Sequence, residues 1–97
     1  MQPIAVLGAG SWGTALAIHL AKNGHSVKLW GHNPGQIAQL QKDRENKKYL
    51  PGIPFPALLS ATDSVEQALT GSDLVLIAVP SHAFRDLILE IKPLLTP

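Results

Sequence analysis

The chain has 97 residues, of which 45% are hydrophobic and 15% charged, and its net charge is +1, which fits one small globular domain and excludes the basic surface of most nucleic-acid-binding proteins. The absence of cysteine excludes disulfides, thiolate metal sites and cysteine nucleophiles, and it fits a reducing compartment. No apolar run approaches the roughly 18–20 residues that span a bilayer, and the N-terminus lacks the basic start of a signal peptide, so we expect a cytoplasmic protein without a membrane partner.

Short apolar runs alternate along the chain with helix-like segments. The expected strands cover residues 3–7, 26–30, 57–61 and 73–79. The expected helices cover residues 11–23, 34–44, 63–69 and 81–95, and residues 45–56 are expected to form a proline-containing loop. The expected N-caps are Ser11, Thr62 or Asp63, and Ser81. This alternation predicts an α/β fold with a doubly wound parallel sheet of about four strands and flanking helices, and the fourth strand is apolar enough for burial on both faces.

A glycine-rich turn joins the first expected strand to the first expected helix. Gly8, Gly10 and Gly13 follow the pattern G-x-G-x-x-G, which at a strand-to-helix junction is the fingerprint of dinucleotide binding. The first glycine permits the tight turn, the second lets the backbone approach a pyrophosphate, and the third lets the helix pack closely on the strand. The helix N-terminus then offers free N–H groups and a positive dipole end to the phosphates.

Two side chains beside this turn each have two interpretations. Ser11 either donates a hydrogen bond to a phosphate or simply caps the helix, and these roles do not exclude each other. Trp12 either covers one side of the cofactor or belongs to the hydrophobic core. The sequence favours neither interpretation of Trp12.

The end of the second expected strand indicates which dinucleotide fits. An NAD-preferring site usually has Asp or Glu there, about 20 residues after the glycine turn, to hold the ribose 2′-hydroxyl. No carboxylate occupies that place, and His32 and Asn33 can donate hydrogen bonds to a 2′-phosphate. We therefore expect the site to accept NADP(H), because no carboxylate repels its 2′-phosphate. We expect NAD(H) to bind as well, because the lack of that repulsion does not exclude a 2′-hydroxyl. The alternative is that His32 is only an exposed loop residue.

Four stretches of the chain together indicate a family: G-A-G-S-W-G-T-A-L-A (residues 8–17), L-W-G-H-N-P (29–34), N-K-K-Y-L-P-G-I (46–53) and A-V-P-S-H (78–82). With them the chain resembles the N-terminal part of the bacterial NAD(P)-dependent glycerol-3-phosphate dehydrogenase family. The resemblance implies a Rossmann-type domain and the reduction of dihydroxyacetone phosphate by NADPH or NADH to sn-glycerol 3-phosphate, which starts phospholipid synthesis. It places Ser11, Trp12 and His32 at cofactor contacts, with Asn33 and Tyr49 as weaker candidates.

The resemblance also concerns the end of the fourth expected strand and the length of the chain. Pro80 is expected to turn the chain past the cofactor, although a plain strand-to-helix turn with Ser81 as cap explains the same residues. Family chains are several times longer, and the catalytic lysine motif and the helical substrate domain lie beyond the matching part. We therefore expect residues 1–97 to be a partial cofactor-binding domain that binds cofactor without turnover, with no catalytic residue assigned. Its apolar fourth strand, left at a sheet edge, predicts a homo-oligomer or a strand-exchanged dimer.

Other functions share some of these features. A non-catalytic NADP(H)-binding module would need the glycine turn but not the stretch at residues 46–53. Another reductase of the same superfamily, such as a ketopantoate reductase or a 6-phosphogluconate dehydrogenase, would not be expected to combine that stretch with V-P-S-H. A structural domain that binds nothing leaves the three glycines unexplained. FAD fits the fingerprint, but the missing acid and the short chain speak against it.

A metal site is not expected, because the spacing of His19, His25 and His82 is not that of metal ligands.

Overall fold

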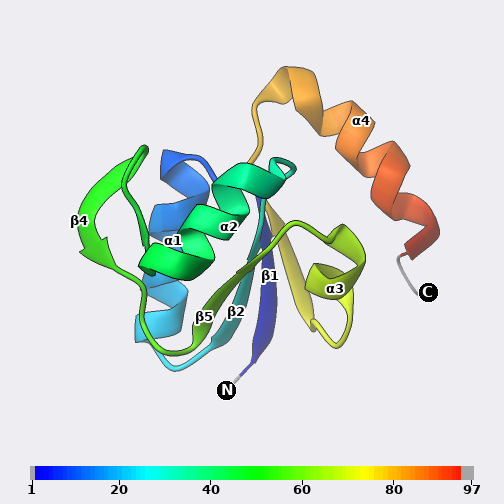
Figure 1. Cartoon of the computed structure of the whole chain (residues 1–97). Helices are drawn as coiled ribbons and strands as arrows, with labels where there is room; N and C mark the ends of the chain where they lie inside the picture. The colour runs from blue at the N-terminus through cyan, green and yellow to red at the C-terminus, as the bar shows by residue number, and fades with distance from the viewer. Residues whose placement is uncertain (1, 95–97) are drawn as a thin grey trace.

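A computed structural model describes residues 2–94 of the chain (Figure 1). The elements in chain order are β1 (Pro3–Leu7), α1 (Ser11–Lys22), β2 (Ser26–Trp30), α2 (Pro34–Asp43), β3 (Glu45–Asn46), β4 (Leu50–Pro54), β5 (Leu59–Thr62), α3 (Val65–Leu69), β6 (Leu74–Ile77), α4 (Ser81–Ile91) and the 3-10 turn η1 (Lys92–Leu94). Four strands form a parallel sheet in the order β5-β2-β1-β6, which confirms the predicted doubly wound arrangement.

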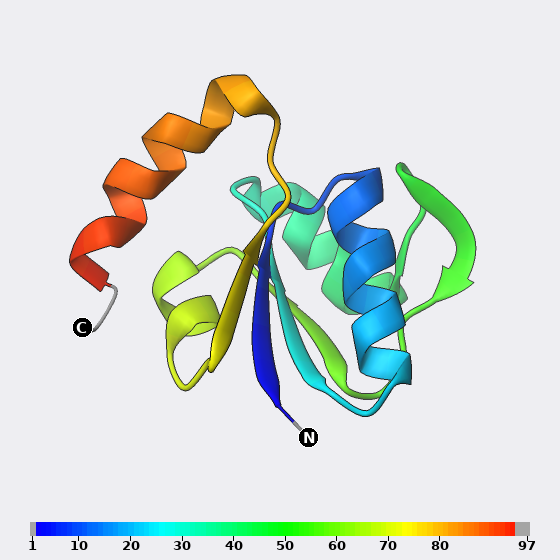
Figure 2. The same ribbon diagram turned by 180° about the vertical axis from the view of Figure 1, so that it is seen from behind.

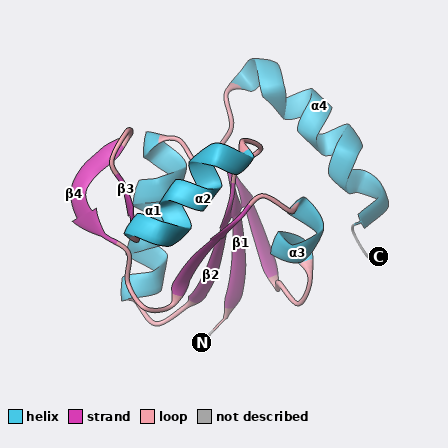
Figure 3. Ribbon diagram, in the orientation of Figure 1, coloured by secondary structure: helices cyan, strands magenta, loops and turns pink. Residues whose placement is uncertain are grey.

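The central strand β1 divides the interior into two hydrophobic clusters. Its side chains alternate, so Ile4 and Val6 join the cluster under α1 and α2, whereas Ala5 and Leu7 join the cluster that includes residues of α3 and α4. Figures 2 and 3 show the same division, with α1 and α2 on one face of the sheet and α3 and α4 on the other. Burial on both faces explains why β1 is a continuous apolar run.

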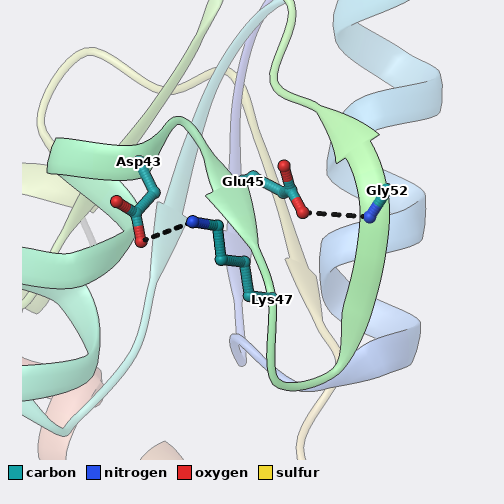
Figure 4. Close-up of polar contacts among 4 residues, drawn as sticks. All are labelled: Asp43, Glu45, Lys47 and Gly52. Carbon is teal, nitrogen blue, oxygen red and sulfur yellow. Dashed lines mark hydrogen bonds and ion pairs between the residues drawn. The ribbon is translucent and has the colours of Figure 1, made fainter.

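The residues expected to form a loop contain a small antiparallel hairpin. β3 pairs with β4, with Glu45 opposite Pro54 and Asn46 opposite Leu50, and the hairpin forms its own two-stranded sheet. The loop prediction was wrong here. Proline has no N–H to donate, but it fits a strand at positions where the partner strand requires no donor. The carboxylate of Glu45 accepts a hydrogen bond from the backbone N–H of Gly52 at 2.9 Å across the hairpin (Figure 4).

Two predicted serine caps are not formed. Helical geometry begins at Ser11 in α1 and at Ser81 in α4, so the N-caps are Gly10 and Pro80, and neither helix has a side-chain cap. A serine in the first helical position has the wrong backbone conformation to cap the amides that follow it. Both serines are exposed.

The other two helices, α2 and α3, do have side-chain caps, but not at residues that the sequence predicted as caps. Ser64, rather than Thr62 or Asp63, caps α3 by accepting a hydrogen bond from the backbone N–H of Gln67 at 3.2 Å. The hydroxyl oxygen of Thr62 instead accepts from the N–H of Ser64 at 3.1 Å. Asn33 caps α2, as described with the site below.

β6 and α4 are less buried than their apolar sequences predict. β6 has one neighbour, β1, in the sheet of residues 2–94, so Leu74 is 39% exposed and the rest of the strand is half-buried. In α4 the apolar residues at helical spacing, Phe84, Leu87 and Ile91, predict one buried stripe, and Leu87 and Ile91 are buried, whereas Phe84 is 47% exposed. Leu95, which continues this spacing, lies outside the described residues. The predicted dimer or strand exchange stays a prediction.

The helices of residues 2–94 include none that is both long enough and apolar enough to cross a membrane.

The capping pattern makes a prediction about stability. Ser64→Ala removes the acceptor for the N–H of Gln67 and is expected to lower the free energy of unfolding by about 0.5–2 kcal/mol. Ser81→Ala is the matched control, because Ser81 caps nothing, and its effect is expected to stay within about 0.5 kcal/mol. Urea unfolding followed by circular dichroism measures both variants. Equal losses for the two serines would contradict the observed caps.

Candidate dinucleotide-binding site

The four parallel strands end in register, so the loops that follow them meet at one edge of the sheet. Leu7 lies opposite both Trp30 and Ile77, and Trp30 lies opposite Thr62. A groove of about 290 Å³ opens at this edge, and it is lined by Gly8, Ala9, Gly10, Trp30, Gly31, His32, Gln36, Tyr49, Ala78, Val79 and Pro80. The carboxyl edge of a parallel sheet, where neighbouring crossovers run to opposite faces, is the usual place for a ligand.

The three glycines of the turn are needed for different reasons. Gly8 has φ +127°, and a Cβ there would overlap the backbone carbonyl of Ala78. A Cβ on Gly13 would overlap the carbonyl oxygen of Gly8, so the start of α1 lies against the end of β1, as predicted. At Gly10 an added Cβ would meet no atom within 4 Å, because this position borders the open groove. Gly8 and Gly13 therefore serve packing, whereas Gly10 leaves space for a ligand.

The N-terminus of α1 is suited to an anion. Among residues 2–94 no side chain caps this helix, and its first turn has no acidic residue. The N–H of Thr14 bonds to the carbonyl of Gly10 at 3.0 Å, and the preceding amides of the first turn have no intrahelical acceptor. The positive end of the helix dipole is thus presented without a competing carboxylate.

Trp12 lies outside the core. Its side chain is 67% exposed, so the interpretation as a core aromatic was wrong. Trp12, Ser11 and Pro80 line a shallow hollow next to the groove, together with Gly10 and the end of β6. The structure thus brings these three candidate residues together on the open side of the glycine turn.

The candidates after β2 border the other end of the groove. His32 is exposed and lies between the groove and a second hollow beyond it. Asn33 also lines that second hollow, and its side-chain oxygen caps α2 by accepting from the N–H of Gln36 at 3.1 Å. The cap uses only the side-chain oxygen, so the amide nitrogen of Asn33 can still donate to a ligand. Tyr49, 41% exposed, comes from the hairpin and lines both spaces.

Asn46 connects the hairpin to the glycine turn, a role that was not predicted. The Asn46 side chain is 1% exposed, and its amide nitrogen donates to the carbonyl of Ala9 at 3.0 Å and to the hydroxyl of Thr14 at 2.9 Å. Its side-chain oxygen accepts from the N–H of Tyr49 at 3.3 Å. The side chain of Gln36 donates to the same Ala9 carbonyl at 3.0 Å. These bonds hold the glycine turn, the hairpin and α2 in one arrangement.

Sequence patterns carry little trace of this network. Asn46 and Ala9 are separated by 37 residues, and a single asparagine in a polar stretch indicates a turn as readily as a buried contact. Its position in the stretch N-K-K-Y-L-P-G-I was the one available signal. Within residues 2–94, no group of three or more His, Cys, Asp or Glu side chains could hold a metal ion.

The Asn46 network makes a second prediction. Asn46→Ala leaves the buried hydroxyl of Thr14 without this donor, and we expect the free energy of unfolding to fall by about 1–3 kcal/mol. Gln39→Ala is the control, because Gln39 is an exposed residue that lines the same hollow, and its effect should stay within about 0.5 kcal/mol. Chemical denaturation measures both. An Asn46 variant as stable as the control would contradict the buried role of this amide.

Comparisons with known proteins find relatives along nearly the whole chain. A glycerol-3-phosphate dehydrogenase [NAD(P)+] from Serratia marcescens is 55% identical over 94 residues, covering 97% of this chain and 28% of that protein. The protein of the same name from Aeromonas hydrophila is 51% identical with the same coverage. The crystal structure of glycerol-3-phosphate dehydrogenase from Coxiella burnetii matches with a TM-score of 0.96 and 45% identity over 99% of this chain and 30% of that one.

A more distant structure shows the shared fold. Glycerol-3-phosphate dehydrogenase from Saccharomyces cerevisiae matches with a TM-score of 0.87 at 22% identity, over 98% of this chain and 31% of that one. The present chain thus spans 28% of the length of its bacterial relatives. Residues 3–97 match the family described as the NAD-dependent glycerol-3-phosphate dehydrogenase N-terminus, for which a nicotinamide dinucleotide is the implied cofactor. The chain belongs to this family.

Proposed function

We propose that this chain is the NAD(P)-binding part of a glycerol-3-phosphate dehydrogenase. The whole enzyme would transfer hydride between NAD(P)H and dihydroxyacetone phosphate and so form sn-glycerol 3-phosphate for phospholipid synthesis. Family membership over residues 3–97 supports the reaction class. The observation that carries the binding role is the open space at Gly10, directly beside the uncapped N-terminus of α1.

The residues of the groove fit a dinucleotide along its length. The pyrophosphate would lie at Gly10, where the first-turn amides of α1 donate to its oxygens. Trp12 and Pro80 would border the half of the cofactor nearest β6, and His32 and Tyr49 the half nearest β2. The bound nicotinamide supplies the hydride, and the residues described here bind and orient the cofactor.

No negatively charged side chain of residues 2–94 lines the groove or the hollow beyond His32 to repel the 2′-phosphate of NADPH. A 2′-phosphate would therefore meet no like charge there, and a 2′-hydroxyl would meet no dedicated acceptor. We infer binding of both NADPH and NADH, with NADPH tighter.

Calorimetric titration of the chain with NADPH and then with NADH tests this function. We expect both titrations to show binding, with the smaller dissociation constant for NADPH. A folded chain that binds neither cofactor would overturn the assignment of the groove. The predictions of a cytoplasmic location and of binding without turnover remain predictions.

The glycine turn makes a prediction that separates binding from folding. Gly10→Ala adds a methyl group that meets no protein atom, at a backbone conformation (φ −82°, ψ −168°) open to any residue. We expect stability close to wild type but at least about a tenfold loss of affinity for NADPH and NADH alike, because the methyl occupies the place of the pyrophosphate.

Gly13→Ala is the counterpart, because its methyl would overlap the carbonyl oxygen of Gly8. This variant is expected to lose stability as well as binding. Thermal unfolding and calorimetry on both variants provide the comparison. Unchanged cofactor affinity in Gly10→Ala would show that no phosphate lies at this position.

A further inference from the structure

A second hollow continues from the groove past the end of β2. The groove and the hollow share His32, Gln36 and Tyr49 in their linings, so the two spaces are adjacent. The hollow has a volume of about 310 Å³, and two lysines of the hairpin turn, Lys47 and Lys48, also line it. The chain therefore places cations where the adenosine end of a dinucleotide would lie.

The two lysines differ in their partners. The ammonium of Lys47 lies 3.8 Å from the carboxylate of Asp43, and the second carboxylate nearby, Glu45, accepts from the N–H of Gly52 (Figure 4). Lys48 forms no ion pair with any residue in the described range, and its ammonium lies 5.2 Å from the centroid of the Tyr49 ring. Lys48 is thus an exposed cation held by a weak contact at the rim of the hollow.

We propose that Lys48 binds the 2′-phosphate of NADPH and is the residue that selects NADPH over NADH. The inference rests on the proposed binding function and names the contact that distinguishes its two cofactors. With a pyrophosphate at Gly10 and a ribose beside His32, the 2′ position would lie next to the hollow, because His32 lines both spaces. The 2′-phosphate is the one chemical difference between the cofactors, and as a phosphate monoester it carries about 1.5–2 negative charges at neutral pH.

Lys48 is better suited to this contact than its neighbours. A lysine binds phosphate as a flexible point charge, and Lys48 gives up only an exposed contact with the Tyr49 ring when it turns toward the ligand. Lys47 would first have to leave Asp43, whose side chain is only 19% exposed. His32 and the amide nitrogen of Asn33 border the same hollow and can add hydrogen bonds, but neither has the fixed charge of a lysine.

The test compares the affinities of variants for NADPH and NADH by calorimetry. Lys48→Gln is expected to raise the dissociation constant of NADPH about tenfold, the loss expected for one charge-assisted contact, and to leave that of NADH within about twofold. Lys48→Arg keeps the charge and is expected to retain most of the preference. Lys22→Gln is the matched control, because it removes the same charge from the last turn of α1, far from the glycine turn. Lys47→Gln is expected to have the smaller effect of the two hairpin lysines.

The outcomes separate this inference from the function on which it rests. If wild type binds neither cofactor, the proposed function and the inference both fail. If wild type binds both and Lys48→Gln keeps the original ratio of dissociation constants, the inference alone is overturned. It is also overturned if Lys48→Gln weakens both cofactors equally, or if Lys22→Gln lowers NADPH affinity as much, because the effect would then be general electrostatics.

Discussion

The close approach of three backbone segments at the glycine turn is the constraint on which the rest of the site depends. α1 lies so near the end of β1 that no side chain fits at Gly13, and β1 lies so near Ala78 that none fits at Gly8. The first turn of the helix therefore begins where the parallel strands end, directly after Gly10, which lines the groove. A larger residue at either position would move the helix and the anion-binding end with it.

The carbonyl of Ala9 extends this arrangement to the far side of the groove. It accepts hydrogen bonds from both Gln36 and Asn46, which come from α2 and from the hairpin. Asn46 also bonds to the N–H of Tyr49, so the wall that carries Tyr49 and Lys48 is fixed relative to the glycine turn. The proposed pyrophosphate site and the proposed site for the ribose substituent would thus be held in a set geometry, which is what discrimination between two similar cofactors requires.

The sequence predicted those parts of the molecule that depend on local patterns. Apolar runs identified β1 and β2 with their observed bounds, and the spacing of Gly8, Gly10 and Gly13 identified the turn. The hairpin escaped prediction because two prolines interrupt the pattern of β4. The serine caps were placed wrongly because the sequence does not fix the first helical residue to within one position, and a cap must lie directly before it. Asn46 contacts Ala9, and Lys48 lies at the same hollow as His32. These residues are far apart in the chain, so no local pattern reveals that they lie together.

The most direct test of the account is a nuclear magnetic resonance titration of the labelled chain with NADPH, followed through its assigned amide signals. The account predicts that the largest shifts fall on residues 8–13, 31–33 and 46–49, which surround the groove and the hollow beyond it. The amide signals of Gly24 and Gly71, which lie in turns after α1 and α3, should not shift. A well-dispersed spectrum that does not change with NADPH, or that changes chiefly around Gly24 and Gly71, would contradict it.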